Sequence, residues 1–536
     1  MSASREKKQR QGDLAQGLTQ KQRQELKEQQ AAKRKAVLYT VIGVVIAVLV
    51  VILLVWHSGI FQRRATAVSV GGRNYNVNDV EYYFRSALAE EYYMGYYTGG
   101  ATFDPSADLH TQYVDEGQTQ SYYDYFMEQA MTRLTEVAAL ENAASEEGFT
   151  LSEEDKAAVE ESINSTKTSA EENGYPNLES YLRANYGRYM TVSDYRACVE
   201  RDTLVNNYKT AYSDKQEVTE EDLETYYQEN AASLDSFDYR YITIDGSAPS
   251  TTDEEGNTVE ATEEEQQAAM DAAKAKADEF AAAVEAAEDK SAAFGELAPD
   301  YVVESSKETY ANDPDYSLQT GTVGSSLNSN FSEWLQDESR VAGDVTVIEG
   351  SSSYYVVLFL DRYRNEDPTV DIRHILVKAE LTQEDDPATE DVDESTVPTQ
   401  EALDAAKAEA ERLLSEWESG DKTADSFGAL AEANSDDTGS NTNGGLYEQV
   451  SRGRMFDAFD AWIFDESRQS GDTTLVENPQ DGQQGWHVIY FQDWDNPVWK
   501  NTADSSIRSQ RLNDWVTGLT DGLEAVQGSG AKYVGE

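Results

Sequence analysis

Two histidines, a methionine and a phenylalanine stand in a pattern that suits chemistry. His374 lies in the alternating apolar segment RHILV and His487 in GWHVI, and together they are half of the 4 histidines in the chain. An imidazole exchanges protons near neutral pH and also donates and accepts hydrogen bonds. Met455 and Phe459 are four residues apart, so they share one face of a helical turn and could form an apolar cup. The pattern indicates either a polar network beside an apolar pocket or two histidines satisfied within a core.

The segments that must hold these residues occur twice. Phe237–Ile244 matches Val370–Val377, and a helix, a short helix and closing strands follow each of them. Equivalent positions are separated by 133, 133, 128 and 132 residues from the first block to the last. A strand period of two followed by a helical period of 3.6 is typical of an α+β domain. We therefore predict an internal duplication, with tandem α+β domains at residues 236–364 and 368–498.

Helical patterns dominate the chain before the duplication. Apolar residues recur at helical spacing between residues 78 and 230, and one more amphipathic pattern closes the chain. We predict a mostly helical domain over residues 65–235, joined by a C-terminal helix at 499–527. The fold class is thus α+β multidomain, with a single N-terminal transmembrane helix ahead of the helical domain.

The transmembrane prediction rests on Ala36–Trp56, a run of 21 residues without a charge. This length crosses the ~30 Å hydrocarbon layer as a helix. Lys33, Arg34 and Lys35 precede the run, which favours a cytoplasmic basic tail at residues 1–35 and a body outside the cytoplasm. The alternative is a cleaved signal peptide, which the long apolar core and the lack of a clear small-residue cleavage site disfavour.

The overall charge restricts the partners. The chain has 43 Lys and Arg against 101 Asp and Glu, a net charge of −58. A body this acidic repels the phosphates of nucleic acid, so we expect no nucleic-acid binding. The single cysteine, Cys198, permits no intramolecular disulfide, and we expect a small buried apolar residue at this position.

The second copy resembles the parvulin-type (PpiC) peptidyl-prolyl cis-trans isomerases. Three blocks carry the resemblance in the family's order and spacing: RHILV, then GG followed by SRGRM and Phe459, and finally GWHVI. In the parvulins the histidines that correspond to His374 and His487 face each other and support the site by hydrogen bonding. Asp437 falls where the family carries Cys or Asp. The resemblance implies that His374, Asp437 and His487 are catalytic and that Met455 and Phe459 bind the substrate.

The chemistry of the reaction agrees with these residue types. A prolyl amide isomerises over ~20 kcal/mol because it must lose its conjugation. Lowering this barrier requires an apolar cup for the proline ring and a polar network adapted to a twisted amide. We therefore expect neither a metal nor a cofactor.

Departures from the family pattern leave the strength of catalysis open. The family's GGDLGWFSRGQM is here GGLYEQVSRGRM, and Gly482 and Gln484 stand where a Thr and often a Ser precede the last histidine. In the first copy Tyr241 and Tyr355 replace the two histidines, and Leu327 replaces the methionine. This copy is expected to keep a parvulin fold for packing or peptide binding without an active site.

The helical segment resembles the N-terminal chaperone domain of SurA and of the Gram-positive PrsA foldases. The resemblance rests on VSVGGRNYNVNDVEYYF, EEGFTLSEEDKAAVEESI and EVTEEDLETYYQENAASL. In that group the domain, joined by the C-terminal helix, cradles unfolded polypeptide; a transmembrane anchor instead of a lipid resembles the foldase PpiD. Nine tyrosines with apolar faces and polar tips fit such a cradle, against the alternative of ordinary helix packing. They are Tyr82, Tyr83, Tyr92, Tyr93, Tyr96, Tyr97, Tyr122, Tyr123 and Tyr125.

The leading hypothesis is a membrane-anchored, extracytoplasmic isomerase and chaperone for secreted or envelope proteins, in a Gram-positive bacterium. The alternative is a non-catalytic holdase or envelope scaffold that uses parvulin folds only to bind extended polypeptide. The clients, the oligomeric state and the choice between a Gram-positive wall zone and a periplasm stay open. Eight acidic residues between Glu380 and Glu394 predict a preference for neutral or basic residues before proline, although Arg452 and Arg454 lie close to the cup in sequence.

Overall fold

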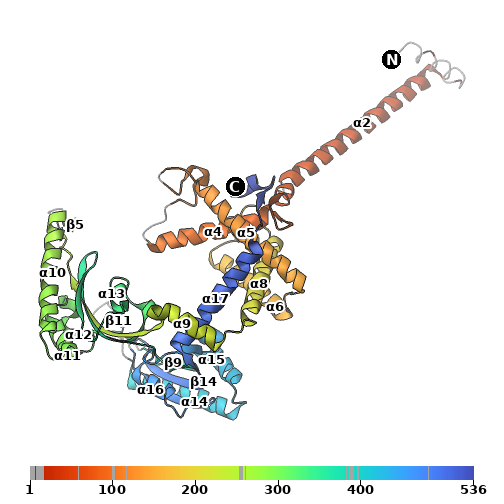
Figure 1. The fold of residues 1–536 in the computed structure, drawn as a ribbon. Helices are drawn as coiled ribbons and strands as arrows, with labels where there is room; N and C mark the ends of the chain where they lie inside the picture. The colour runs from red at the N-terminus through yellow and green to blue at the C-terminus, as the bar shows by residue number, and fades with distance from the viewer. Residues whose placement is uncertain are drawn as a thin grey trace. The chain divides into compact units, whose positions relative to one another are not determined.

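The computed structural model describes most of the chain and divides into two compact units. Unit 1 comprises residues 1–216 and 511–536, and unit 2 comprises residues 217–510. Figure 1 shows helices and sheets in the arrangement of an α+β multidomain protein, which confirms the predicted fold class. The described residues are Lys7, Gly17, 19–57, 59–98, 103–115, 117–252, 258–259, 261–381, 383–385, 392–394, 398–480 and 482–535.

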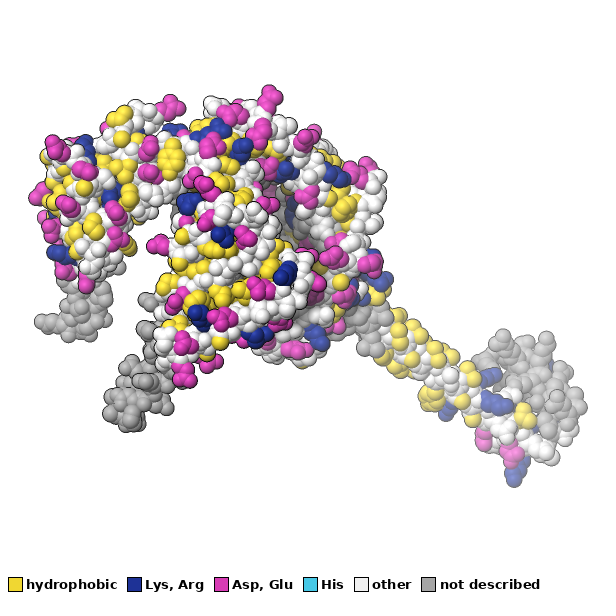
Figure 2. Space-filling view, turned by 90° about the horizontal axis from the view of Figure 1, so that it is seen from below, with side chains coloured by type: hydrophobic (Ala, Val, Ile, Leu, Met, Phe, Trp, Pro, Cys, Tyr) yellow, Lys and Arg dark blue, Asp and Glu magenta, His cyan; other side chains and the backbone are white. Residues whose placement is uncertain are grey.

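The predicted membrane segment lies in the first long helix of unit 1, α2 (Gln20–His57). By length and composition α2 can cross a membrane, because the span Lys21–Ile52 contains a window with a mean hydropathy of 2.7 and none of that window is buried. Figure 2 shows apolar side chains over the middle of this helix and charged side chains towards its N-terminal end. The helix begins at Gln20, well before Ala36, because the Gln, Glu, Lys and Ala residues of the tail are strong helix formers.

The remainder of unit 1 is a helical domain with one small sheet. The helices α5 and α8 pack against α4, and the buried residues of these elements form the main core. Ser152, Asn177 and Thr191 cap the helices α6, α7 and α8 by accepting backbone N–H bonds. The elements are α3 (Ile60–Arg63), β1 (Thr66–Val70), β2 (Arg73–Asn76), α4 (Val77–Thr98), η1 (Leu109–Thr111), α5 (Tyr122–Glu147), α6 (Glu153–Glu172), α7 (Leu178–Asn185), α8 (Val192–Asp214), β15 (Val526–Gln527) and η5 (Ala531–Tyr533).

The C-terminal segment of unit 1 differs from the prediction, which places one helix over residues 499–527. Helix α17 (Val498–Thr520) stops at Thr520, and Gly522 follows with a φ of +75°, a conformation that favours glycine. Strand β15 then pairs antiparallel with β1 and gives the sheet order β15-β1-β2. The backbone N–H of Gly535 donates to buried Glu81 at 2.7 Å. The C-terminal segment is therefore part of the fold of this unit.

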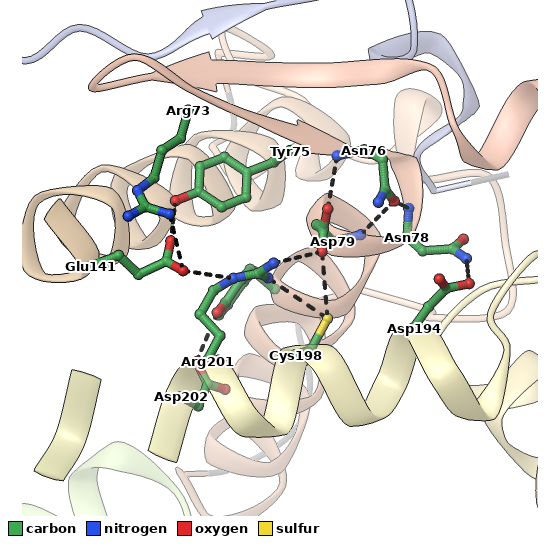
Figure 3. Close-up of polar contacts among 11 residues, drawn as sticks. Arg73, Tyr75, Asn76, Asn78, Asp79, Glu141, Asp194, Cys198, Arg201 and Asp202 are labelled. Carbon is green, nitrogen blue, oxygen red and sulfur yellow. Dashed lines mark hydrogen bonds and ion pairs between the residues drawn. The ribbon is translucent and has the colours of Figure 1, made fainter. Parts of the chain in front are cut away.

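A buried polar network joins β2, α4, α5 and α8 within unit 1 (Figure 3). Arg201 on α8 donates to Asp79 at 3.0 Å, lies 3.7 Å from Glu141 and stacks over the ring of Tyr75. The Arg201, Asp79 and Glu141 side chains are only 15%, 11% and 14% exposed, so the charges depend on one another for compensation. Cys198 is buried beside Asp79, and burial raises the pKa of its thiol, as expected of an unreactive cysteine.

Unit 2 contains the two predicted α+β copies, and their sheets have the same topology. The strand order is β6-β3-β8-β7 in the first copy and β12-β9-β14-β13 in the second. In each copy two helices cover one face of the sheet and a short helix covers the other.

The elements of the first copy are β3 (Ser236–Asp245), β4 (Thr251–Thr252), β5 (Thr258–Val259), α10 (Glu263–Glu285), α11 (Lys290–Leu297), η2 (Ala298–Asp300), α12 (Glu304–Asn312), β6 (Leu318–Val323), η3 (Gly324–Ser326), α13 (Ser332–Gln336), β7 (Val345–Glu349) and β8 (Ser353–Tyr363). Those of the second are β9 (Pro368–Lys378), β10 (Gln383–Asp385), β11 (Val392–Glu394), α14 (Gln400–Ser419), α15 (Ala424–Asn434), η4 (Asn441–Asn443), β12 (Leu446–Val450), α16 (Asp457–Ile463), β13 (Thr473–Asn478) and β14 (Gly485–Pro497).

Helix α9 (Glu220–Leu234) and the start of α17 also belong to unit 2. The sequence instead predicts that both belong to the helical domain, which it places at residues 65–235 and 499–527. The physical reason is the guanidinium of Arg364, between the two copies, which stacks on Tyr227 of α9 and on Trp499 of α17. It also pairs with Glu224 at 2.8 Å. The boundaries of the helical domain remain predictions.

One motif is the same in both copies and has a structural role. The sequence W-x-x-D-E-S-R places Arg340 over Trp334 at 5.0 Å and Arg468 over Trp462 at 4.8 Å. Each arginine also pairs with the Asp of its motif and with a second Asp four residues beyond the arginine. Because the copy without histidines retains this arrangement, the motif supports the fold.

Candidate active site

The two histidines lie on adjacent central strands of the second sheet and on one face. Alternation along β9 directs Ile375 and Val377 towards α14 and α15, and Ile372 towards α16. His374 shares the face of Ile372. On β14, His487 shares the face of Ile489, which is directly opposite His374 in the register. The histidines are therefore diagonal neighbours, as the resemblance implied, and both are buried, at 2% and 8% exposure.

A chain of hydrogen bonds links both histidines to Asp437. The Nε2 atom of His374 is 3.0 Å from Oδ2 of Asp437, and the two Nδ1 atoms of His374 and His487 are 3.0 Å apart. In the contact between the two Nδ1 atoms one imidazole donates and the other accepts, and the tautomers decide which is which. Burial, with the nearby His374 as a second cause, lowers the pKa of His487 to about 3. His487 is thus a neutral hydrogen-bonding group at physiological pH.

Asp437 is held as an ionised acceptor. Its Oδ2 atom accepts from Ser440 Oγ at 2.5 Å and from Tyr447 OH at 3.0 Å, in addition to His374. The hydrogen bond from His374, followed by that from Ser440, places the pKa of Asp437 well below its usual range, against the opposing effect of burial. A carboxylate with these partners orients His374 and does not donate a proton near neutral pH.

The two consecutive glycines position this network. Gly444 and Gly445 have φ values of +72° and +68°, which other residues rarely adopt. A Cβ on Gly445 would lie 2.1 Å from the carbonyl oxygen of His374, so a side chain is excluded there. The N–H of His374 donates to Gly445 O at 2.9 Å, and Arg373 donates to Gly444 O at 2.9 Å. The GG pair therefore fixes the backbone of His374.

Met455 and Phe459 line a cleft beside the histidines. The cleft has a volume of about 230 Å³, below the range of a drug-sized site and suited to one or two residues of an extended chain. Phe459 is 1% exposed, and its ring lies edge-on to His487 at 5.3 Å. The lining residues are His374, Leu376, Asp437, Tyr447, Arg454, Met455, Phe456, Phe459, Asn478, Gln480, Gln483 and His487. All five predicted site residues thus meet at one cleft.

Sequence reasoning missed Ser440, Tyr447 and Phe456. The ring of Tyr447 stacks on His374 with centroids 4.8 Å apart, so an aromatic is present although GGLYEQV departs from the family motif. No sequence motif marks Ser440 or Tyr447 as a site residue, because each reaches Asp437 only through the tertiary arrangement of its loop or strand. Phe456 is next to Met455 in sequence and could have been included on that ground.

The loop that departs from the family pattern also lies at the cleft. Gly482 has a φ of +73°, and the Gln484 carbonyl accepts from Ala379 N–H at 2.8 Å. Asn478 donates to Gln483 O at 2.9 Å and holds the turn. Gln480 and Gln483 of this loop line the cleft. Within the acidic loop at 380–394, residues 382 and 386–391 lie outside the described residues, and the side chains of β10 and β11 are not described.

In the first copy the positions equivalent to the two histidines, Met455 and Phe459 belong to a hydrophobic cluster. Tyr241, Leu327 and Phe331 pack with Tyr355, and the rings of Tyr241 and Tyr355 lie 5.2 Å and 5.7 Å from that of Phe331. The register places Tyr241 opposite Val357 as it places His374 opposite Ile489. The fold is duplicated, whereas the hydrogen-bonded chain is built in the second copy.

Comparison with known proteins agrees with the geometry of the second copy. The family model "Rotamase: PPIC-type PPIASE domain" matches residues 374–493. The chaperone SurA of Nitrosococcus oceani is 27% identical over 195 residues, which are 34% of this chain and 39% of SurA. The chain therefore spans less than half the length of this curated relative.

Solved structures of PrsA are also similar to parts of the chain. The peptidylprolyl isomerase PrsA of Bacillus anthracis has 18% identity, covers 29% of this chain and 58% of its own, and has a TM-score of 0.17. The foldase PrsA of Streptococcus pneumoniae has 18% identity, covers 46% and 73%, and has a TM-score of 0.19. The family match, together with the His374–Asp437–His487 network, identifies residues 374–493 as a PPIC-type peptidyl-prolyl isomerase domain.

Proposed function

We propose that the chain is a membrane-anchored, extracytoplasmic peptidyl-prolyl cis-trans isomerase and chaperone. The observation that carries the proposal is the Asp437–His374–His487 network above a cleft lined by Met455 and Phe459. The cleft accepts the proline ring, and the fixed polar groups stabilise the twisted amide more than the planar one. Prolyl isomerisation by the detergent-solubilised full chain tests it, with the variants described in the Discussion.

The alternative, a holdase or envelope scaffold without catalysis, is favoured by Gly482 and by Gln484 in place of the family's hydroxyl residues. The same assay separates the two functions. A holdase suppresses the aggregation of an unfolded protein without accelerating prolyl isomerisation, whereas the proposed enzyme does both.

The chaperone part of the proposal is assigned to the end of α4. Of the nine tyrosines with a predicted cradle role, Tyr83 and Tyr122 are buried, and Tyr82, Tyr123 and Tyr125 pack against the core of unit 1. The remaining four lie on α4 and are exposed, together with Met94. Their exposed fractions are 39% for Tyr92, 65% for Tyr93, 74% for Tyr96 and 82% for Tyr97. Such a patch offers an unfolded client apolar contact area with little loss of side-chain entropy.

We expect the triple variant Tyr93→Ser, Tyr96→Ser, Tyr97→Ser to suppress the aggregation of a chemically unfolded protein several-fold less well than the parent. Light scattering during dilution of the client from denaturant measures this effect. The matched control is Tyr316→Ser in unit 2, a tyrosine that is also exposed, at 53%. Equal suppression by parent and triple variant, with equal helicity by circular dichroism, would remove α4 from the client-binding surface.

The cellular location follows from α2 and its flanking charges. With Lys33, Arg34 and Lys35 before the apolar run, we propose a cytoplasmic N-terminus and an extracytoplasmic body, in the Gram-positive wall zone. Protease added outside spheroplasts is expected to digest the body and to leave a fragment close to residues 1–60 protected. A soluble mature form that begins after Trp56 would show instead that the segment is a cleaved signal peptide.

A further inference from the structure

The charge at the entrance of the cleft comes from Arg454. This residue follows Gly453, whose φ of +81° turns the chain, and precedes Met455 of the cup. The turn is held by Gly453 N–H, which donates to Asp460 at 2.8 Å, and by Arg454 N–H, which donates to Ser451 O. Arg454 is exposed to solvent and lines the same cleft as His374 and His487. Its guanidinium is therefore presented to whatever occupies the cleft.

The other arginines of unit 2 are engaged. Arg373 donates to backbone carbonyls of the GG loop, and Arg452 lies over the ring of Phe464 at 4.6 Å. Within the described part of residues 217–510, Arg454 is the arginine for which we find neither an ion pair, nor a side-chain hydrogen bond, nor a ring. The arginines with a carboxylate partner are Arg240, Arg340, Arg362, Arg364, Arg412, Arg468 and Arg508.

An unpaired guanidinium is unusual in a body this acidic, and the described lining of the cleft supplies no partner. Asp437 is the one carboxylate among the described lining residues, and its Oδ2 atom already accepts from His374, Ser440 and Tyr447. Arg454 is also the one lysine or arginine among those lining residues. A guanidinium with free donors binds carboxylates through two parallel hydrogen bonds.

We propose that Arg454 makes the isomerase selective for prolines flanked by an acidic residue, with the guanidinium binding the Asp or Glu side chain of the client. This inference rests on the proposed isomerase function and names its substrate class. It is opposite to the preference that the acidic segment at 380–394 suggests from sequence. Arg454 lines the cleft directly, whereas residues 382 and 386–391 of that segment lie outside the described residues. Charges beyond a Debye length of ~8–10 Å are largely screened at physiological salt.

The test compares peptides that differ only in charge. Ala-Glu-Pro-Phe and Ala-Gln-Pro-Phe, blocked at both ends, are assayed with the full chain, and Ala-Ala-Pro-Glu and Ala-Ala-Pro-Gln place the acid after the proline. We expect kcat/KM for a Glu peptide to exceed that for its Gln partner by about two- to fivefold, the range of an exposed ion pair. The ratio should approach one in Arg454→Gln and fall below one in Arg454→Glu.

Arg452→Gln is the matched control, since Arg452 is two residues away and does not line the cleft; it should keep the parental Glu-to-Gln ratio. Active protein with a ratio of one at both positions would overturn the inference and leave the isomerase function standing. A ratio that survives in Arg454→Glu would overturn it as well. Failure to accelerate any of the four peptides would instead refute the proposed function on which the inference depends.

Discussion

Met455→Ala is expected to lower kcat/KM for a prolyl peptide about tenfold, whereas Leu327→Ala at the equivalent position of the first copy should change it less than about twofold. Met455 lines the cleft with Phe459, and truncation to Ala removes apolar contact with the proline ring that amounts to about 1–2 kcal/mol. Leu327 lies 128 residues earlier, in a cluster with Tyr241 and Tyr355 and without histidines. The two variants therefore test a truncation to Ala at equivalent positions of the same fold, in one copy with the hydrogen-bonded His–Asp network and in one copy without it.

His374→Ala should have the larger effect, about 100-fold, which is typical of removing one preorganised hydrogen-bonding group from an active site. It leaves Asp437 without its His374 donor and His487 without its hydrogen-bond partner. Tyr241→Ala is the matched variant, and we expect close to parental activity from it. The measurement is the catalysed cis-to-trans rate of a proline peptide, with circular dichroism as a check that each variant is folded.

Similar losses from Met455→Ala and Leu327→Ala, or from His374→Ala and Tyr241→Ala, would show that both copies act on prolyl bonds. Unchanged activity in all four variants would place the reaction outside the cleft. Either result contradicts the assignment of catalysis to the second copy alone.

Arg201→Ala is expected to destabilise unit 1 by about 3–5 kcal/mol, the cost of removing one partner from a buried ion pair. Asp79 would lose its ion-pair partner, Glu141 would keep Arg73 at 3.4 Å, and Tyr75 would lose the guanidinium over its ring (Figure 3). Hydrogen exchange followed by mass spectrometry measures this effect locally, because amides of α4, α5 and α8 should exchange faster while those of β9 and β14 keep their protection.

Arg196→Ala on the same helix is the matched control. Arg196 forms a bidentate ion pair with Glu160, with both hydrogen bonds at 2.8 Å, but the two side chains are 35% and 55% exposed. Solvent screens such a pair, so we expect a loss below about 1 kcal/mol. Equal hydrogen-exchange rates in the two variants would mean that the buried ion pair of Arg201 stabilises unit 1 no more than the exposed ion pair of Arg196 does.

The sequence by itself determined the duplication, the α+β class of both copies and five residues of the cleft, namely His374, Asp437, Met455, Phe459 and His487. These features are encoded locally, because strand alternation, helical spacing and the motif residues around His374, Met455 and His487 lie in short segments. The loss of the histidines in the first copy was equally visible. The family match to residues 374–493 confirms the assignment of the second copy.

The tertiary structure alone decided how these residues are connected. Ser440 and Tyr447 reach Asp437 from a loop and an edge strand, and this meeting depends on the backbone path through Gly444 and Gly445. Contacts between segments far apart in the chain also decide three further features. These are the exposure of the α4 tyrosines, the unpaired guanidinium of Arg454 and the pairing of β15 with β1. Local pattern fixes which face of an element is apolar, but long-range packing fixes which polar groups meet and which remain exposed.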